Sequence, residues 1–213
     1  ILGQVEVEKR IPLANGPHNL SASMTARKVY VAIIAEPLIQ VIDMDTNEII
    51  ADIETGGGVH NTFVTPDGRY AVGGMIGASE IIAIDTATDE VEFELYIPYS
   101  QNPFTGGVRP LAFTVNDDGS TRSILVNVGG WHGFWEFDWE TQELMNKVSP
   151  PDGSWNRMDQ TADGIQSAPS HGIVVLPDQS QVWHSSRATS HIYGYSFPDY
   201  EYLGRVYIGN PAW

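Results

Sequence analysis

The sequence predicts an all-β fold built from a structural unit that occurs four times, and three observations support this prediction. Residues 16–56 are followed by a near copy of themselves in residues 57–95. One phrase that ends a strand and opens a turn returns at intervals of 42, 53 and 58 residues. Its positions in the four copies are Asp43, Asp85, Asp138 and Ser196. The spacing of apolar residues shows almost no helical periodicity. A period of about 40–50 residues with several short strands per unit is typical of a β-propeller blade.

Each unit is expected to contain four short antiparallel strands. In the first copy, runs of apolar and β-branched residues bounded by turn residues such as Thr46-Asn47 indicate where they lie. These four strands are predicted at 20–23, 29–34, 38–43 and 48–53. The complete blades are predicted at about 16–56, 57–107, 108–166 and 167–208. In a propeller the first strand of each blade lines the central channel.

Both ends of the chain align with parts of further blades. Residues 1–7 align with residues 202–208, so we expect 1–15 to hold the fourth strand of a preceding blade. Residues 209–213 align with the lead-in to a first strand and are expected to start a following blade. We therefore expect 1–213 to be a single, incomplete propeller domain, either an arc of a seven-bladed ring or a part that a second chain completes. An open arc exposes blade edges, which favours self-association.

Composition excludes several classes of function. The chain of 213 residues has a formal net charge of −16 and a pI near 4.5, whereas nucleic acids and anionic membranes attract clustered Lys and Arg. There is no cysteine, hence no disulfide and no thiolate metal site. No apolar run approaches the ~20 residues of a membrane span.

The start of the chain and its lack of thiols bear on processing and location. The chain begins at Ile1 without an initiator Met, so we expect a processed or partial product. The lack of thiols favours a periplasmic or secreted location.

Three motifs resemble the YVTN-type β-propeller repeat. They are Lys28-Val29-Tyr30-Val31-Ala32, the Ile-Asp-x-x-Thr phrase of the first two blades, and Val64-Thr65-Pro66-Asp67-Gly68-Arg69. This repeat is shared by surface-layer and periplasmic propellers and, more loosely, by the propellers of haem nitrite reductases and amine dehydrogenases. The resemblance covers residues 16–208 and is weaker in the last two blades, where Asp117-Asp118-Gly119 and Pro177-Asp178-Gln179 replace the Pro-Asp-Gly turn. It implies the fold and says little about activity, since propellers serve many functions.

Histidines recur just before the first strand of three blades. His18, His60 and His171 occupy this position, Pro110 occupies it in the third blade and Trp213 in the next. Equivalent positions face the same channel, so the three imidazoles are expected to converge. Such a group suits a divalent metal or an anionic or haem-like ligand. The alternative is that each histidine hydrogen-bonds a neighbouring blade, and Asn19 and Asn61, which follow two of them, favour this alternative.

The connections on the same face of the disc suggest a rim around this site. Two long insertions, 97–107 and 148–170, lie between blades, where loop variation marks either a binding face or simple drift in length. The second-to-third strand connections of the last two blades add aromatic and basic residues. The expected rim comprises Arg109, Trp131, His132, Arg187 and His191.

Three functions remain open from the sequence. The first is a propeller that binds a small-molecule ligand or a protein partner at the channel mouth. The second is a metal-dependent enzyme resembling lactonase or lyase propellers, in which the histidines hold a divalent cation. No carboxylates align at the inner positions, which weighs against this second function. The third is a docking subunit of a redox or cell-surface assembly.

Overall fold

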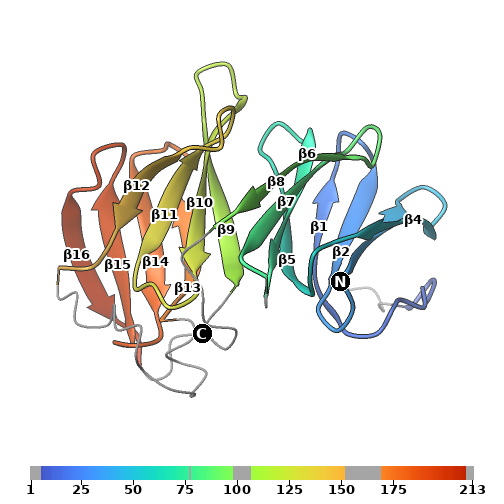
Figure 1. Ribbon diagram of the computed structural model, residues 1–213, viewed down its shortest axis with the longest axis horizontal. Coiled ribbons are helices and arrows are strands. Elements are labelled where there is room, and N and C mark those ends of the chain that lie inside the picture. The colour runs from blue at the N-terminus through green and yellow to red at the C-terminus, as the bar shows by residue number, and fades with distance from the viewer. Residues whose placement is uncertain (1–5, 77, 98–106, 152–168, 210–213) are drawn as a thin grey trace, which may run out of the picture.

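The computed structural model describes residues 6–76, 78–97, 107–151 and 169–209, whose regular structure consists of strands only (Figure 1). The strands form four antiparallel sheets, each made from four consecutive strands in chain order. Blade 1 contains β1 (Pro17–Ser23), β2 (Lys28–Ile33), β3 (Leu38–Asp43) and β4 (Glu48–Glu54). Blade 2 contains β5 (Val59–Val64), β6 (Tyr70–Met75), β7 (Glu80–Asp85) and β8 (Val91–Tyr96). Blade 3 contains β9 (Val108–Val115), β10 (Thr121–Val128), β11 (Phe134–Asp138) and β12 (Leu144–Val148). Blade 4 contains β13 (Ser170–Val175), β14 (Gln181–Ser186), β15 (His191–Ser196) and β16 (Tyr202–Tyr207).

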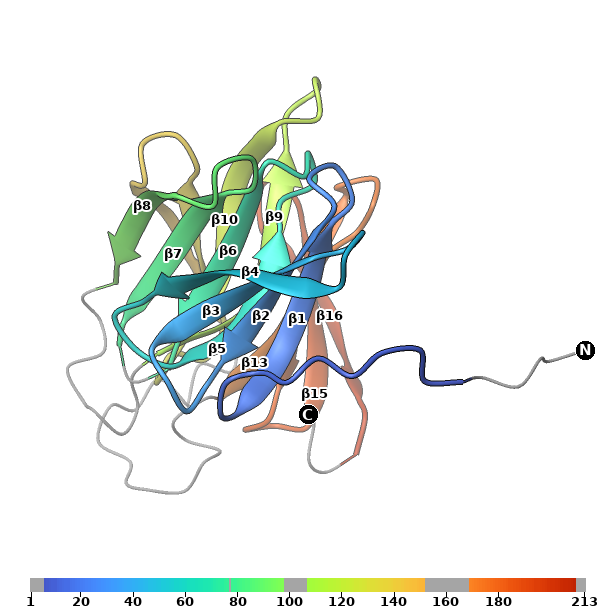
Figure 2. The same cartoon turned by 90° about the vertical axis from the view of Figure 1, so that its right-hand side faces the viewer.

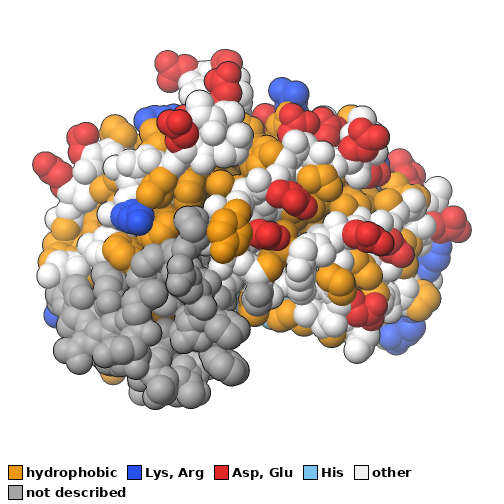
Figure 3. All heavy atoms as spheres, in the orientation of Figure 1, with side chains coloured by type: hydrophobic (Ala, Val, Ile, Leu, Met, Phe, Trp, Pro, Cys, Tyr) orange, Lys and Arg blue, Asp and Glu red, His pale blue; other side chains and the backbone are white. Residues whose placement is uncertain are grey.

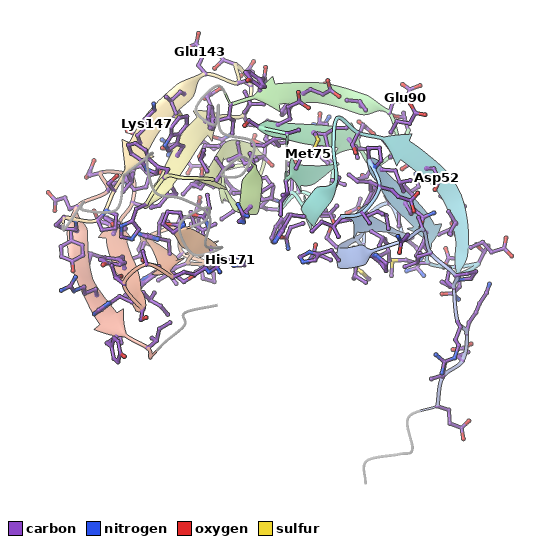
Figure 4. All side chains as sticks on the ribbon, turned by 60° about the horizontal axis from the view of Figure 1, so that its bottom comes forward. Asp52, Met75, Glu90, Glu143, Lys147 and His171 are labelled. Carbon is purple, nitrogen blue, oxygen red and sulfur yellow. The ribbon has the colours of Figure 1, made fainter. Side chains whose placement is uncertain are left out.

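The predicted fold, an arc of four-stranded propeller blades, is confirmed. The first strands of neighbouring blades contact one another, β1 with β5, β5 with β9, and β9 with β13. They line the inner side of an arc, and the fourth strands lie toward its outside (Figure 4). In blade 1 the predicted strand 38–43 is found with the same bounds, and the predicted strand 20–23 begins earlier, at Pro17.

Backbone hydrogen bonds define the two faces of the arc. In each blade, the residue after the second strand donates its N–H to the residue before the first strand. The four pairs are Ile34 with Gly16, Ile76 with Gly58, Gly129 with Gly107, and Arg187 with Pro169. On the opposite face, the turn after the third strand donates to the turn after the first strand, as Met44 N–H does to the Arg27 carbonyl. The loops expected to surround the channel mouth therefore share one face, here called the mouth face.

Turns on the opposite face are fixed by aspartates. The Asp43 carboxylate accepts from the backbone N–H groups of Asp45 and Thr46, and Asp138 accepts in the same way from Glu140 and Thr141. These bonds hold the pKa of Asp43 and Asp138 below the ordinary value. The recurring aspartates are therefore turn-forming residues that stabilise the fold.

The core consists of apolar side chains packed between consecutive blades. Between blades 1 and 2 it is mainly aliphatic, with Ile39, Val41, Ile82 and Ile84 fully buried. Between blades 3 and 4 it is aromatic. That interface is formed by Phe134, Tyr193 and Tyr195, packed with partly buried Phe197 and Tyr200. Burial of such side chains is the main stabilising contribution to a fold of this kind.

The segment before blade 1 covers the outward face of that blade (Figure 2). Ile11, Leu13 and Ala14 pack against buried Val31 and Ile33. Residues 6–16 contain no strand. Residues 1–5 and 210–213 lie outside the described residues, so the two partial blades stay predictions. None of the described residues forms a helix with the length and apolarity that crossing a membrane requires.

Candidate functional site

The inner strands are irregular at the positions where the sequence predicts a site. The pairing of β1 with β2 shifts between Pro17 and Asn19, which places His18 in the irregularity. His60 occupies the equivalent position in β5, between Val59 and Asn61. A shift also brackets His171 in β13, and another brackets Arg109 in β9. Such bulges redirect a side chain out of the regular alternation and are frequent beside functional sites.

The three predicted histidines converge. The ring centroids of His18 and His60 lie 4.3 Å apart, and those of His60 and His171 lie 5.8 Å apart. The side chain of His171 lies on the inner side of the arc, whereas Glu90 and Glu143 lie at its outer edge (Figure 4). Residues from blades 1, 2 and 4 therefore meet at one place on the mouth face.

Close backbone approach holds blades 1 and 2 together beside this place. A Cβ atom on Gly58 would lie only 2.1 Å from the carbonyl oxygen of Ile34. Only glycine allows the lead-in to β5 to pass so near the preceding blade. The position of His60, two residues later, depends on this contact.

Hydrogen bonds determine which ring nitrogens of His18 and His60 carry a proton. His18 Nδ1 donates to the backbone carbonyl of His60, at 2.6 Å, and His60 Nδ1 donates to the side-chain oxygen of Asn61. Both acceptors are carbonyl oxygens, so each Nδ1 bears hydrogen and each Nε2 of the neutral ring carries a lone pair. The bond from His18 is the contact with a neighbouring blade that the alternative interpretation expected. His18 is nevertheless exposed and lines a hollow of about 220 Å³ with Leu13, Pro17 and Leu20.

Two arginines complete the group. Arg109 comes from β9, and Arg187 follows β14, where its backbone N–H is held by the carbonyl of Pro169. Burial, together with the charge of Arg187, lowers the pKa of Arg109 to about 10. We call His18, His60, Arg109, His171 and Arg187 the axial cluster.

His60 and His171 are neutral at pH 7. Burial lowers the pKa of His60 from 6.5 to about 4, and the nearby His18, Arg109 and His171 lower it further, although its bond to Asn61 opposes the shift. Burial also lowers the pKa of His171 to about 4, with Arg109 and Arg187 adding to the effect. Desolvation and like charge both disfavour the imidazolium. The axial cluster thus combines permanent guanidinium charges with neutral imidazoles.

The described residues contain no group of three or more His, Asp or Glu side chains placed to hold a metal ion. The centroid of the His60 ring is within 6 Å of both other rings, and the bonds at Nδ1 of His18 and His60 leave only their Nε2 atoms as possible ligands. The adjacent arginines would also repel a divalent cation. The geometry therefore does not support the predicted metal site at His18, His60 and His171.

Three of the expected rim residues belong elsewhere. His132 is fully buried between blades 3 and 4, and its Nε2 contacts Ser186 Oγ at 2.8 Å, so it cannot line a channel mouth. Trp131 packs toward the outer strand of blade 3, where its Nε1 donates to Val148 and its ring faces Trp135. The His191 ring packs on Tyr207 of the outer strand β16. These placements correct the expected rim, in which only Arg109 and Arg187 join the three histidines.

Sequence reasoning missed the sixth histidine, His184. It is almost completely buried in β14, and its ring stacks on Tyr193 with a centroid separation of 5.3 Å. Burial lowers its pKa to about 3, with His132 adding to the effect. A signal was available, because Val182, His184 and Ser186 alternate with less buried residues along β14. We call His132 and His184 the interblade pair.

Comparisons with known proteins support the fold. No protein-family model matches the sequence, and neither does any curated protein. Among solved structures, the chain is similar to the hydrazine synthase of Kuenenia stuttgartiensis, with a TM-score of 0.68 and 12% identity over 97% of this chain and 53% of that chain. It is similar to the β-propeller domain of Cps50 (Swd1) from Myceliophteria thermophila, with a TM-score of 0.71 and 9% identity over 95% of this chain and 59% of that chain.

A third similar structure is dihydro-haem d1 dehydrogenase NirN in complex with DHE, with a TM-score of 0.64 and 14% identity over 95% of this chain and 39% of that chain. The chain thus spans about half the length, or less, of the structures that it matches. Likeness at such low identity shows a shared β-propeller fold and nothing about ligands. The resemblance to the YVTN-type repeat has no matching family model and stays a prediction.

The two insertions fall largely outside the described residues. Of 97–107, the structure describes Ile97 and Gly107, and of 148–170 it describes 148–151 and 169–170. Trp213 also lies outside them. The predicted contribution of the insertions to a binding face therefore stays a prediction.

Proposed function

We propose that this chain is a ligand-binding propeller whose site is the axial cluster on the mouth face. The observation that carries the proposal is the convergence of His18, His60 and His171 at matching irregularities of three inner strands. Arg109 acts electrostatically on His60 and His171, and Arg187 acts on His171. Small-molecule sites are concave and contain a few converging polar groups that fix the orientation of the ligand, and the axial cluster supplies such groups.

Thermal-shift measurements on a panel of small organic acids, sugars and nucleotides would test this proposal. Three proteins are compared: wild type, His60→Gln and His191→Gln. The last is the control, because the His191 ring packs on the outer strand of blade 4. We expect at least one compound to raise the Tm of wild type and His191→Gln but not of His60→Gln. Equal stabilisation of all three proteins, or of none by any compound, would contradict an axial site.

Two alternatives lead to different results. A metal-dependent enzyme would contain a stoichiometric transition metal that is lost in His60→Ala. A docking subunit would bind a protein partner through 97–107 and 148–170 and would tolerate changes in the axial cluster. The periplasmic or secreted location stays a prediction, which fractionation of cells expressing the full gene would test.

A further inference from the structure

Resting on the proposed function, we propose that the axial cluster binds an oxyanion, a carboxylate or a phosphate group, with Arg109 as its principal anchor. Arg109 is mostly buried, and its Nη1 atom has no hydrogen-bond partner among the residues that the structure describes. A guanidinium keeps its charge at all relevant pH values and carries five N–H donors in a planar fork. Carboxylates and phosphates accept two such bonds side by side, which no neutral group does as well.

The charged neighbours of this arginine in the described residues are all basic. Arg187 is the charged group that acts on Arg109, and both arginines act on His171. On His60 the acting groups are His18, Arg109 and His171. The two guanidinium groups repel an added cation and attract an added anion, so the shared space favours a negative ligand.

The rest of the surface makes this concentration of basic groups exceptional. The chain has 11 Lys and Arg residues against 27 Asp and Glu residues, and acidic side chains are spread over the face seen in Figure 3. An acidic protein repels anions from most of its surface. Specific binding of an anion therefore requires a local group such as the axial cluster.

The hydrogen bonds of the imidazoles imply that binding takes up protons. His60 uses Nδ1–H to bond Asn61, so its neutral ring presents an Nε2 lone pair, which repels an oxyanion. The groups that face His60 are His18 from β1, Arg109 from β9 and His171 from β13. An anion offsets the field of Arg109, so protonation of Nε2 becomes favourable and supplies a further donor. By linkage, a lower pH must then tighten anion binding.

Isothermal titration calorimetry with inorganic phosphate and with citrate would test the inference. Measurements at pH 6.5 in two buffers of different ionisation enthalpy give the number of protons taken up. We expect saturable binding of one anion per chain with proton uptake, and the stronger of the two probes shows whether the site prefers phosphate or carboxylate. Affinity should fall at least about tenfold in Arg109→Gln, which corresponds to loss of a charge-assisted hydrogen bond.

Arg69→Gln is the matched control, because Arg69 is exposed on the opposite face, beside the Tyr70 ring. It should bind both probes as wild type does. Arg109→Gln should fold at least as well as wild type, because it removes a buried like charge next to Arg187. Its Tm in anion-free buffer therefore separates loss of binding from loss of folding.

Several outcomes would overturn the inference. Absence of saturable binding of both probes would do so, as would equal affinity in Arg109→Gln and wild type. Binding of Zn²⁺ that depends on His60, without binding of either oxyanion, would contradict the inference that the ligand is an oxyanion. The proposal of a ligand site in the axial cluster would then still hold. If no probe and no compound of the panel bound, the proposed function would fail as well.

Discussion

The axial cluster and the interblade pair place the same side chain in opposite surroundings. His18 and His60 keep hydrogen bonds to oxygen acceptors. Arg109 acts on both His60 and His171, and Arg187 acts on His171. His184 is instead stacked on Tyr193 and Tyr195, with ring centroids 5.3 and 5.8 Å away, and its ring nitrogens form no well-aligned hydrogen bond. Burial lowers the pKa of His60, His171 and His184 alike, and arginine charge adds to this effect only at His60 and His171.

The difference shows that a lowered histidine pKa does not by itself indicate a binding site. In the interblade pair, burial among aromatic rings accounts for most of the shift, and the histidines act as core side chains. In the axial cluster, exposed His18, two neighbouring arginine charges and redirected strands accompany the shift. The surroundings of each histidine therefore separate a binding role from a packing role.

The largest effect is expected from truncating the interblade pair. His184→Ala should lower the free energy of unfolding by about 3 kcal/mol, as for other large buried rings, because the stacked aromatics cannot close the cavity. His184→Phe fills the same space without buried polar nitrogens and should lower it by less than about 1.5 kcal/mol. Urea unfolding followed by far-ultraviolet circular dichroism measures both changes. A loss in His60→Ala as large as that in His184→Ala would show that the two regions do not differ.

An effect of similar size for each histidine concerned is expected from acid. The folded-state pKa values are about 3 for His184 and about 4 for His60 and His171, below the ordinary 6.5. Between these values and 6.5 the unfolded chain binds more protons, so the free energy of unfolding falls as the pH drops from about 6.5 toward 4. At pH 4.5, His184 alone should account for about 3 kcal/mol of this loss.

Urea unfolding at pH 4.5 and 7.5 should therefore show a weaker pH dependence in His184→Phe than in wild type. Phosphate at saturating concentration should restore part of the remaining loss, because an anion favours the imidazolium of the axial histidines. It should not restore the part due to His184, which no ligand reaches. An identical pH dependence in His184→Phe and wild type would contradict the role assigned to that residue.

The repeat made the fold and the inner part of the site predictable. Register along a strand is a local property, so aligned copies placed His18, His60 and His171 at equivalent positions from sequence alone. The bulges at these positions and the hydrogen bond from His18 to the next blade could not be predicted, since they depend on how two sheets approach. Arg109 and Arg187 were predicted as rim residues and lie in the inner group instead.

The expected outer rim failed because a loop's position does not determine where its side chains point. Trp131 and His132 do lie in the connection between β10 and β11, as predicted. His132 turns inward because Ser170 Oγ accepts the N–H of Gly133, which docks this connection on blade 4. Gly133 has a φ of +126°, and a Cβ there would lie 1.9 Å from the carbonyl oxygen of Val148. Such contacts between blades cannot be recognised from the repeat period or from the amino-acid composition of the sequence.

The smallest effect is expected for His18→Ala, which tests whether an axial histidine also stabilises the fold. The substitution removes the hydrogen bond from His18 Nδ1–H in blade 1 to the backbone carbonyl of His60 in blade 2. Because His18 is exposed, the substitution leaves no cavity in the core. One such bond contributes about 1 kcal/mol, so the free energy of unfolding should fall by that amount. Urea unfolding measures the change, with Arg69→Gln as a control that leaves both regions intact. Because a cross-blade bond also holds His60 in place, His18→Ala should weaken phosphate binding slightly while leaving proton uptake measurable. A loss of about 3 kcal/mol, equal to that in His184→Ala, would instead mean that the axial histidines are core residues of the same kind as the interblade pair.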